Sequence, residues 1–367
     1  MKRKTLLVAG VALVVGMLVA SWGTTTSGAA EPLKVAWILG GPISDVGWTA
    51  AHHRGIKAVE KAFPGKVEIT YKESVPAGPQ TTQVIDSLVQ AGNKVIFTSS
   101  IGFARYTEAA AQKYPDVKFM QFEGANIRDN LASFNANFPD GFYLTGMAAG
   151  AASKSGTIGI VGAFPSPSNV RAINELLLGA RRFKSEATVR VVFINAWFDP
   201  PKETQAAQSL LASGADVLGM MMNSPSTGQV AEKAGIPFLG RDSDQRSFAP
   251  NSYLAGAILN WAPYYVNEVE SILNGRWKPQ ATMLHMKDGV VEVIFGNGYQ
   301  KFVKEAERAE IAKMEAQIRS VEFYAFTGPL HDQSGKLRVG AGEKLPWSDA
   351  LHMDWFVKGV ITSSPGR

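Results

Sequence analysis

The stretch KVAWILGGPISDVGWTAAHHRG (34–55) contains, in order, an apolar run, a loop and a helical segment. The run KVAWIL is short and β-rich, as a buried strand is. Glycines and a proline shape the loop, and a helix is predicted from about residue 46. Repetition of this order is typical of βαβ units in a parallel sheet. The same stretch places Trp48 near the start of the helix, where its ring serves either core packing or ligand stacking.

The strand–loop–helix order recurs along the chain. Predicted strands cover 34–39, 67–73, 94–99, 118–123, 157–164, 189–197, 216–222 and 236–242. Segments such as TTQVIDSLVQAG (81–92) carry apolar residues at intervals of three and four, as crossover helices do. The order repeats about four times, is interrupted near 131–146, and resumes about four times. We therefore expect an α/β fold of two doubly wound, Rossmann-like lobes joined by crossover strands.

The remaining segments set the expected bounds of these lobes. An apolar run at 252–259 and a helix at 260–275 return the chain to the first lobe, and the turn signals of 326–339 predict a hairpin. The expected first lobe is 31–137 plus about 259–281, and the second is 138–258 plus about 282–367. Ligands of open parallel sheets bind at the carboxyl ends of strands, so both lobes should contribute loops to one cleft.

The first thirty residues are predicted to be an export signal. MKRK and the apolar run after it precede small residues at 28–30, a plausible cleavage site, although an uncleaved membrane anchor is the alternative. Removing this leader lowers the formal charge from +5 to +2, with 34 basic and 32 acidic residues left. No nucleic-acid partner is therefore expected. The chain has no cysteine, which favours a soluble periplasmic protein without a lipid anchor.

The sequence lacks the common motifs of catalysis. The mature chain has no G-x-S-x-G elbow, no phosphate-binding loop and no pair of histidines at i and i+4, and thiol chemistry is excluded. We expect no enzyme, no cofactor and no metal. RDSDQ (241–245) has too few oxygen ligands for a calcium loop. Its acids either cap the next element or, at Asp242, accept hydrogen bonds from a ligand.

Aromatic residues follow several predicted strands. They are Trp48, Phe103, Phe164, Trp197 and Trp261. A single such ring is more often core than ligand platform. Two rings from opposite lobes would instead hold a planar ligand between them, and each base–aromatic stack contributes about 1–3 kcal/mol.

The order and spacing of five segments resemble the basic-membrane-protein family of ABC-transporter substrate-binding proteins. These segments are LGGPISDVGWTAAHHRGIKAVEKAF, AAQKYPDVKFMQFEG, DGFYLTGMAAGAASKSGTIGIVG, FDPPKETQAAQSLLASGADVL and AEKAGIPFLGRDSDQ. The resemblance extends from about residue 34 to 278. It implies the type I periplasmic binding protein fold, capture of purine nucleosides or related compounds, and an inner-membrane ABC permease as partner. A monomer is expected.

The resemblance also implies a set of ligand-binding residues. In the family the base lies between two rings, an acid of the first lobe pairs with its polar edge, and the Asp-Ser-Asp-Gln loop reaches toward the ribose. By position, the stacking pair is Trp48 and Trp197, and the polar contacts are Glu123 and Asp242. The other candidates are Asn223, Gly102, Phe103, Asn137, Asp45, Asn260 and Trp261.

Departures from the family pattern narrow the expected ligand. The larger ring of Trp48 stands where a phenylalanine is typical, and Asn260 takes the place of a lysine that contacts ribose. A lost cation favours an uncharged, flatter ligand, so a free purine base such as adenine is favoured over a nucleoside. A sugar- or autoinducer-binding protein of the same fold, a nucleoside hydrolase and a sensory role are the alternatives.

Overall fold

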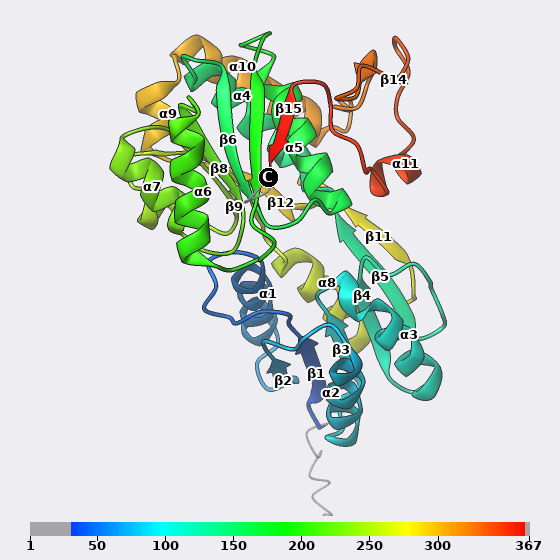
Figure 1. The fold of residues 1–367 in the computed structure, drawn as a ribbon. Coiled ribbons are helices and arrows are strands. Elements are labelled where there is room, and N and C mark those ends of the chain that lie inside the picture. The colour runs from blue at the N-terminus through cyan, green and yellow to red at the C-terminus, as the bar shows by residue number, and fades with distance from the viewer. Residues whose placement is uncertain (1–30, 364–367) are drawn as a thin grey trace, which may run out of the picture. The chain divides into compact units, whose positions relative to one another are not determined.

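The computed structural model describes residues 31–363, so the expected leader at 1–30 lies outside the described residues. Two large β-sheets, each covered by helices, make up most of it (Figure 1). The expected α/β class with two Rossmann-like lobes is confirmed. Within 31–363, no helix has both the length and the apolar character that a bilayer crossing requires.

The first lobe is built on a six-stranded sheet in the order β11-β5-β4-β3-β1-β2. All of its strands are parallel. Its elements are β1 (Leu33–Ile38), α1 (Trp48–Ala62), β2 (Val67–Lys72), α2 (Pro79–Gln90), β3 (Val95–Thr98), α3 (Ala104–Lys113), β4 (Lys118–Phe122), β5 (Leu131–Ala136), α8 (Ala262–Leu273) and β11 (Ala281–Leu284).

The second lobe has a seven-stranded sheet in the order β12-β10-β9-β8-β6-β7-β15, in which only the β10–β12 pair is antiparallel. Its elements are α4 (Pro139–Ala152), β6 (Thr157–Gly162), α5 (Pro167–Ala180), β7 (Thr188–Phe193), α6 (Pro200–Ala212), β8 (Val217–Met221), α7 (Ser226–Ala234), β9 (Phe238–Asp242), β10 (Tyr253–Leu259), β12 (Val291–Phe295), α9 (Asn297–Phe302), α10 (Glu305–Arg319), α11 (Trp347–Leu351) and β15 (Val360–Ser363). The predicted hairpin consists of β13 (Leu330–His331) and β14 (Leu337–Val339).

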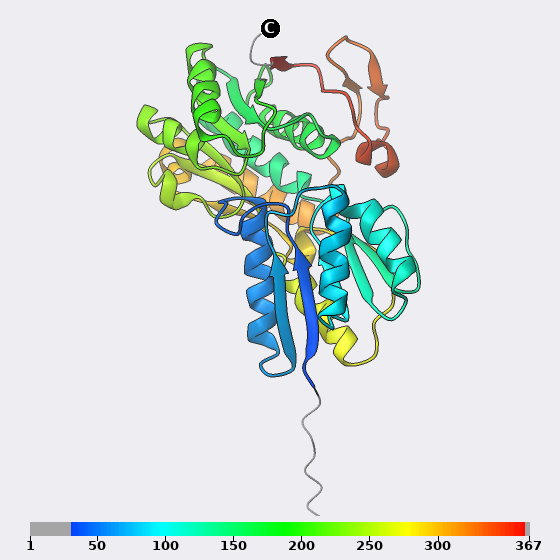
Figure 2. The same cartoon turned by 60° about the horizontal axis from the view of Figure 1, so that its bottom comes forward.

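Alternation along β1 explains how helices cover both faces of the first sheet. Val35 and Trp37 belong to the core cluster that includes Ile56 of α1 and Tyr265 of α8. Ile38 belongs to a separate cluster with residues of α2 and α3. Figure 2 shows the strands between the blue helix α1 and the lighter blue helix α2. The carboxyl ends of the strands are left for loops.

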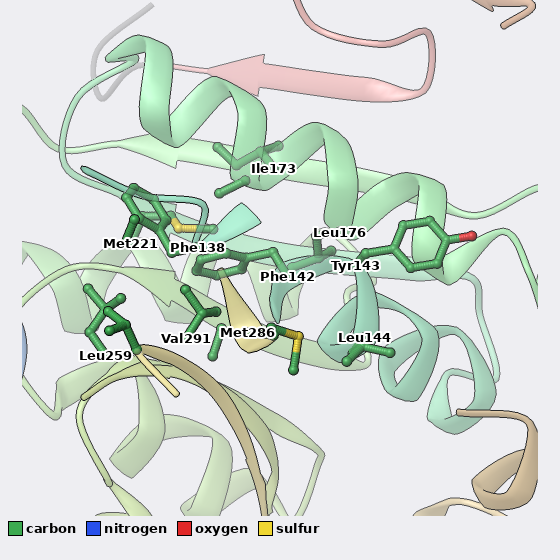
Figure 3. Packing of buried hydrophobic residues seen from close by; sticks show 14 of the residues in the cluster. Phe138, Phe142, Tyr143, Leu144, Ile173, Leu176, Met221, Leu259, Met286 and Val291 are labelled. Atoms are coloured by element: carbon green, nitrogen blue, oxygen red, sulfur yellow. The ribbon is translucent and has the colours of Figure 1, made fainter. Parts of the chain in front are cut away.

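Helices α4 and α5 pack with their backbones in close approach. A Cβ on Gly146 of α4 would lie 2.1 Å from the carbonyl oxygen of Leu176, so only glycine permits this crossing. Phe142 of α4 lies with Ile173 of α5 on one side and Val291 of β12 on the other (Figure 3). This packing fixes α5, whose first turns begin at the carboxyl end of β6.

The chain passes between the two sheets after β5, after β10 and after β11. The interrupted stretch 131–146 forms β5 in the first sheet and then the start of α4 in the second lobe. The return to the second lobe was expected after about residue 281. In the structure 281–284 is still β11, because these residues pair in parallel with 133–136 of β5.

Candidate functional site

Trp48 begins α1 and is held rigidly at the carboxyl end of the first sheet. Its Nε1 donates to the carbonyl oxygen of Ser99, just after β3, at 3.0 Å. Phe122, His52 and Trp261 meet its ring edge to face, with centroids 4.8, 4.7 and 5.8 Å away. Trp48 remains partly exposed. The surroundings therefore fix the orientation of a ring that is not enclosed.

Trp197 lies in the loop after β7 of the second lobe and is 42% exposed. Its only aromatic neighbour among the described residues is Phe164, whose ring centroid is 5.7 Å away. Contiguous exposed apolar groups, unlike single ones, often mark a binding site, and the next residue in sequence, Phe198, is 57% exposed. The second predicted stacking ring is thus free to meet a ligand.

Asn223 connects the segments that carry the two tryptophans. Its backbone N–H donates to the carbonyl oxygen of Trp197 at 3.0 Å, and its own carbonyl oxygen accepts from the N–H of Val46 at 3.3 Å. A Cβ on Gly47 would come within 2.5 Å of the Asn223 Oδ1 atom. The loop after β8 therefore lies directly against the start of α1, two residues before Trp48.

Glu123 supplies a carboxylate at the end of β4. Its backbone has a left-handed φ of 54°, uncommon for a residue with a Cβ and typical of functional sites. Burial raises the pKa of this carboxyl, while the Arg171 charge and a 3.3 Å hydrogen bond from Asn135 Nδ2 partly oppose the rise. The predicted polar acceptor is thus present beside a cation that comes from the second lobe.

Asp242 ends β9, also with a left-handed φ, of 59°. It is 2% exposed, and its Oδ2 atom pairs with Arg241 Nε at 2.8 Å. Burial raises the pKa of its carboxyl, and the Arg241 guanidinium lowers it in part. The ion pair occupies one carboxylate oxygen, which leaves at most the other for a ligand.

Three further candidates have intramolecular roles. Asp45 caps α1, because its carboxylate accepts from the N–H groups of Gly47 and of residues 49 and 50 at 2.8–3.1 Å. Asn260 Oδ1 accepts from the N–H of Ala262, and its Nδ2 donates to Glu292. Trp261 is fully buried and lies parallel to the ring of His52 behind Trp48. All three shape the site from behind.

The last three candidates divide between core and site. Phe103 is fully buried in the α2–α3 cluster, so the structure places its ring in the core and not beside Trp48. Gly102 N–H donates to Ser100 Oγ in the same short turn. Asn137 is 5% exposed, and its Oδ1 atom has no hydrogen-bond partner in the described part of the chain. Buried polar atoms are nearly always paired, so Asn137 keeps an acceptor for another group.

Three residues near the site were missed by sequence reasoning. Arg54 of α1 bonds to the Asp-Ser-Asp-Gln loop. Arg171 is 1% exposed, and its Nε and Nη2 atoms have no hydrogen-bond partner among residues 31–363. Glu203 is fully buried and supports the loop of Asn223 by accepting from Ser224 Oγ at 2.5 Å. Arg171 could have been found from the sequence, because it is a charged residue within the apolar helical pattern NVRAINELLL (169–178).

The surface hollows of the molecule lie apart from this site. In the described part of the chain, no three His, Asp or Glu side chains gather as a metal centre would require. One open hollow follows α8, and another lies near the end of α5; no predicted site residue lines either. The hollows are lined by Asn267, Glu268, Glu270, Ser271, Arg276, Trp277, Lys278 and Gln280, and by Ser155, Gly156, Phe183, Lys184, Ser185 and Glu186.

Known structures share this architecture. A solute-binding protein of an ABC transporter system from Conexibacter woesei superposes with a TM-score of 0.67 at 21% identity, covering 80% of this chain and 98% of that one. A second, from Aeropyrum pernix, gives a TM-score of 0.69 at 14% identity over 80% and 93%. At these identities the likeness concerns the fold.

Sequence comparison gives nearer relatives. A purine-binding protein of Brucella abortus is 38% identical over 92% of this chain and 95% of its own length. A putative ABC transporter glucose-binding protein of Haloferax volcanii is 32% identical over 81% and 75%. The family model described as "ABC transporter substrate-binding protein PnrA-like" matches residues 33–322. These matches cover the strand-end loops described above, and the chain belongs to the family of PnrA-like ABC transporter substrate-binding proteins.

Proposed function

We propose that this chain is the periplasmic receptor of an ABC importer and captures a purine between its lobes. Family membership implies a small-molecule ligand and a membrane permease. The observation that carries the proposal is the pair of rings on opposite lobes: Trp48 is fixed and partly open, Trp197 is exposed, and Asn223 bonds to the segments of both. A planar ligand can stack on both rings only when the lobes close.

Polar groups of the site suit a purine edge. Glu123 accepts from a ring N–H or an exocyclic amine, and the unpaired Nε and Nη2 atoms of Arg171 are donors for ring nitrogens. The purine-binding relative in Brucella abortus supports the same ligand class. A free base such as adenine is favoured over a nucleoside, because Asn260 is committed to Glu292 and Ala262 and offers no cation to a ribose.

A sugar is the competing ligand. The glucose-binding name of the Haloferax volcanii relative favours it, and aromatic rings also stack on pyranose faces. The strand-end loops of the site carry carboxylates that could accept from hydroxyl groups. Identifying the bound ligand therefore decides between a purine receptor and a sugar receptor.

Native mass spectrometry of the protein as purified, followed by calorimetry, tests the proposal. We expect a bound mass equal to a purine, absorbance near 260 nm in the released material, and tighter binding of adenine than of adenosine. The calorimetric panel is adenine, hypoxanthine, adenosine, inosine and glucose. Binding of glucose with no response to any purine would overturn the proposal. Binding of nucleosides but not of bases would overturn the preference for a free base.

A further inference from the structure

A group of hydrogen bonds joins the two lobes beside the proposed ligand site. We call the residues that form them the latch: Val46, Gly47 and Arg54 of the first lobe, and Asp242, Ser243 and Gln245 of the second. Ser243 Oγ donates to the carbonyl oxygen of Gly47 at 2.8 Å, and Gln245 Nε2 donates to that of Val46 at 3.0 Å. Arg54 Nη1 donates to Ser243 Oγ at 3.0 Å, and its Nη2 donates to the Asp242 carbonyl oxygen at 3.3 Å.

The latch is built from well-placed groups. Ser243 is 3% exposed and Gln245 is fully buried. Arg54 bonds to two oxygen atoms of one loop, which fixes that loop relative to α1. Burial lowers the pKa of the Arg54 guanidinium, while the negative charges of Asp242, Asp244 and Asp45 raise it. Four bonds of this kind between two elements form a specific contact between the lobes.

Every latch bond joins protein to protein. None uses the ring of Trp48 or Trp197 or the carboxylate of Glu123 or Asp242, because Asp242 contributes only its backbone carbonyl oxygen to the latch. The loop of Asn223 can also lie close to the start of α1, because Gly47 has no Cβ that would collide with Asn223. The stability of these bonds therefore adds to the closed arrangement whatever ligand is bound.

We propose that Arg54, Ser243 and Gln245 are positioning residues that stabilise the closed arrangement of the lobes and thereby set the affinity for every ligand by one common factor. A receptor whose binding-competent form is only partly populated binds each ligand more weakly by that fraction. Loss of the latch lowers the fraction of protein in the binding-competent form. It does not alter the groups that are assigned to ligand contact. The affinity part of this inference rests on the proposed purine-binding function, whereas the closure part does not.

Arg54→Ala and Ser243→Ala test the proposal by calorimetry with adenine and with hypoxanthine, and by X-ray scattering of the protein without added ligand. We expect Arg54→Ala to weaken both purines by the same factor, roughly tenfold, since two hydrogen bonds are lost. Its scattering should shift to a larger radius of gyration. Arg54→Lys should recover part of both effects, because an ammonium group reaches one of the two acceptors.

Arg246→Ala is the matched control. Its guanidinium binds only Asp244 of its own loop, so affinity and radius of gyration should stay at the wild-type values. Unequal losses for the two purines would overturn the proposal, since they would make Arg54 a ligand contact. Wild-type affinity and scattering in both Arg54→Ala and Ser243→Ala would also overturn it. If no purine binds, scattering alone still decides whether the latch closes the lobes.

Discussion

At the scale of single residues, Trp48 is the best-positioned of the proposed ligand contacts. Its indole N–H is bonded to Ser99, and three aromatic neighbours hold the ring edge to face. Such preorganisation lowers the entropy that a side chain loses when a ligand stacks on it. The ring can therefore contribute its full stacking free energy to binding.

Replacing Trp48 by alanine should weaken adenine binding by about tenfold or more, since one stack is worth about 1–3 kcal/mol. Trp48→Phe keeps an aromatic face, although it loses the bond to Ser99, and should bind with an intermediate affinity. Calorimetry measures both. An unchanged affinity in Trp48→Ala would show that the ring is packing alone.

Glu203 makes stability depend on pH. Burial raises the pKa of its carboxyl to about 7 from an ordinary 4.5. Below pH 4.5 the group is protonated in both the folded and the unfolded state and costs nothing. Between 4.5 and about 7 only the unfolded state ionises, so the free energy of unfolding falls as pH rises. Above pH 7 the ionised carboxyl lowers the free energy of unfolding by its full amount, about 3 kcal/mol.

Glu203→Gln should remove this pH dependence. The amide can still accept from Thr227 and meet Ser224, the two side chains that bond to the carboxylate. Urea unfolding at pH 5 and pH 8 should show that the variant gains stability relative to wild type at the higher pH. Equal differences at the two pH values would contradict the raised pKa of Glu203.

Some site residues could be predicted from sequence and others could not. The position of Trp48 after a strand-end loop was readable, because a glycine- and proline-rich turn precedes a helical pattern. Phe103 also follows a strand, but the short turn at 101–103 directs its ring into the core. Arg54 owes its role to a loop nearly 190 residues away in sequence. Such contacts depend on tertiary placement, which no local pattern contains.

At the scale of elements, α5 ties the C-terminal segment to the second lobe. Asn174 Nδ2 donates to the carbonyl oxygen of Trp355 at 3.0 Å, and its Oδ1 accepts from the N–H of Val357 at 2.8 Å. Arg171 Nη1 donates to the carbonyl oxygens of Ala350 and Leu351. These side chains add to the backbone bonds that the segment makes with residues 331–333 of the hairpin.

Asn174→Ala should lower the free energy of unfolding by about 2–3 kcal/mol, because two backbone groups lose their partner in a buried place. Asn126→Ala is the control. Its amide bonds to Glu108 on the exposed surface, so a change within about 0.5 kcal/mol is expected. Urea denaturation measures both variants. An equally small loss of stability in both variants would mean that solvent reaches the backbone groups bonded to Asn174.

The sequence predicted the presence of most strands more accurately than the residues at which they end. The predicted strand at 189–197 ends at Phe193, because Asn195 takes a left-handed φ of 57° that leaves the sheet. The strand at 281–284 was not expected, since its residues are only partly apolar and partly exposed. It is defined by pairing with β5, a contact about 150 residues distant.

At the scale of the whole molecule, the backbone amide of Val46 reports directly on contact between the lobes, and the amide of Asn223, bonded within the second lobe, is its comparison. The N–H of Val46 donates across the lobes to Asn223, and the N–H of Asn223 donates to Trp197. Opening the lobes breaks the first bond, so exchange of the Val46 amide with solvent deuterium requires that opening. A ligand held by both lobes must leave before they separate.

Adding adenine should therefore slow deuterium exchange of the Val46 amide, whose bond crosses the lobes, more than that of the Asn223 amide, whose bond lies within the second lobe. At a free ligand concentration one hundred times Kd, opening costs about 2.7 kcal/mol more, which slows exchange by about a hundredfold. Peptides of the hairpin at 330–339, which makes no contact with the site, should exchange at an unchanged rate. An unchanged exchange rate at Val46 in the presence of bound adenine would mean that the ligand does not hold the lobes together. Slowing at Val46 requires a ligand that keeps the two lobes in contact, as stacking between rings on opposite lobes demands.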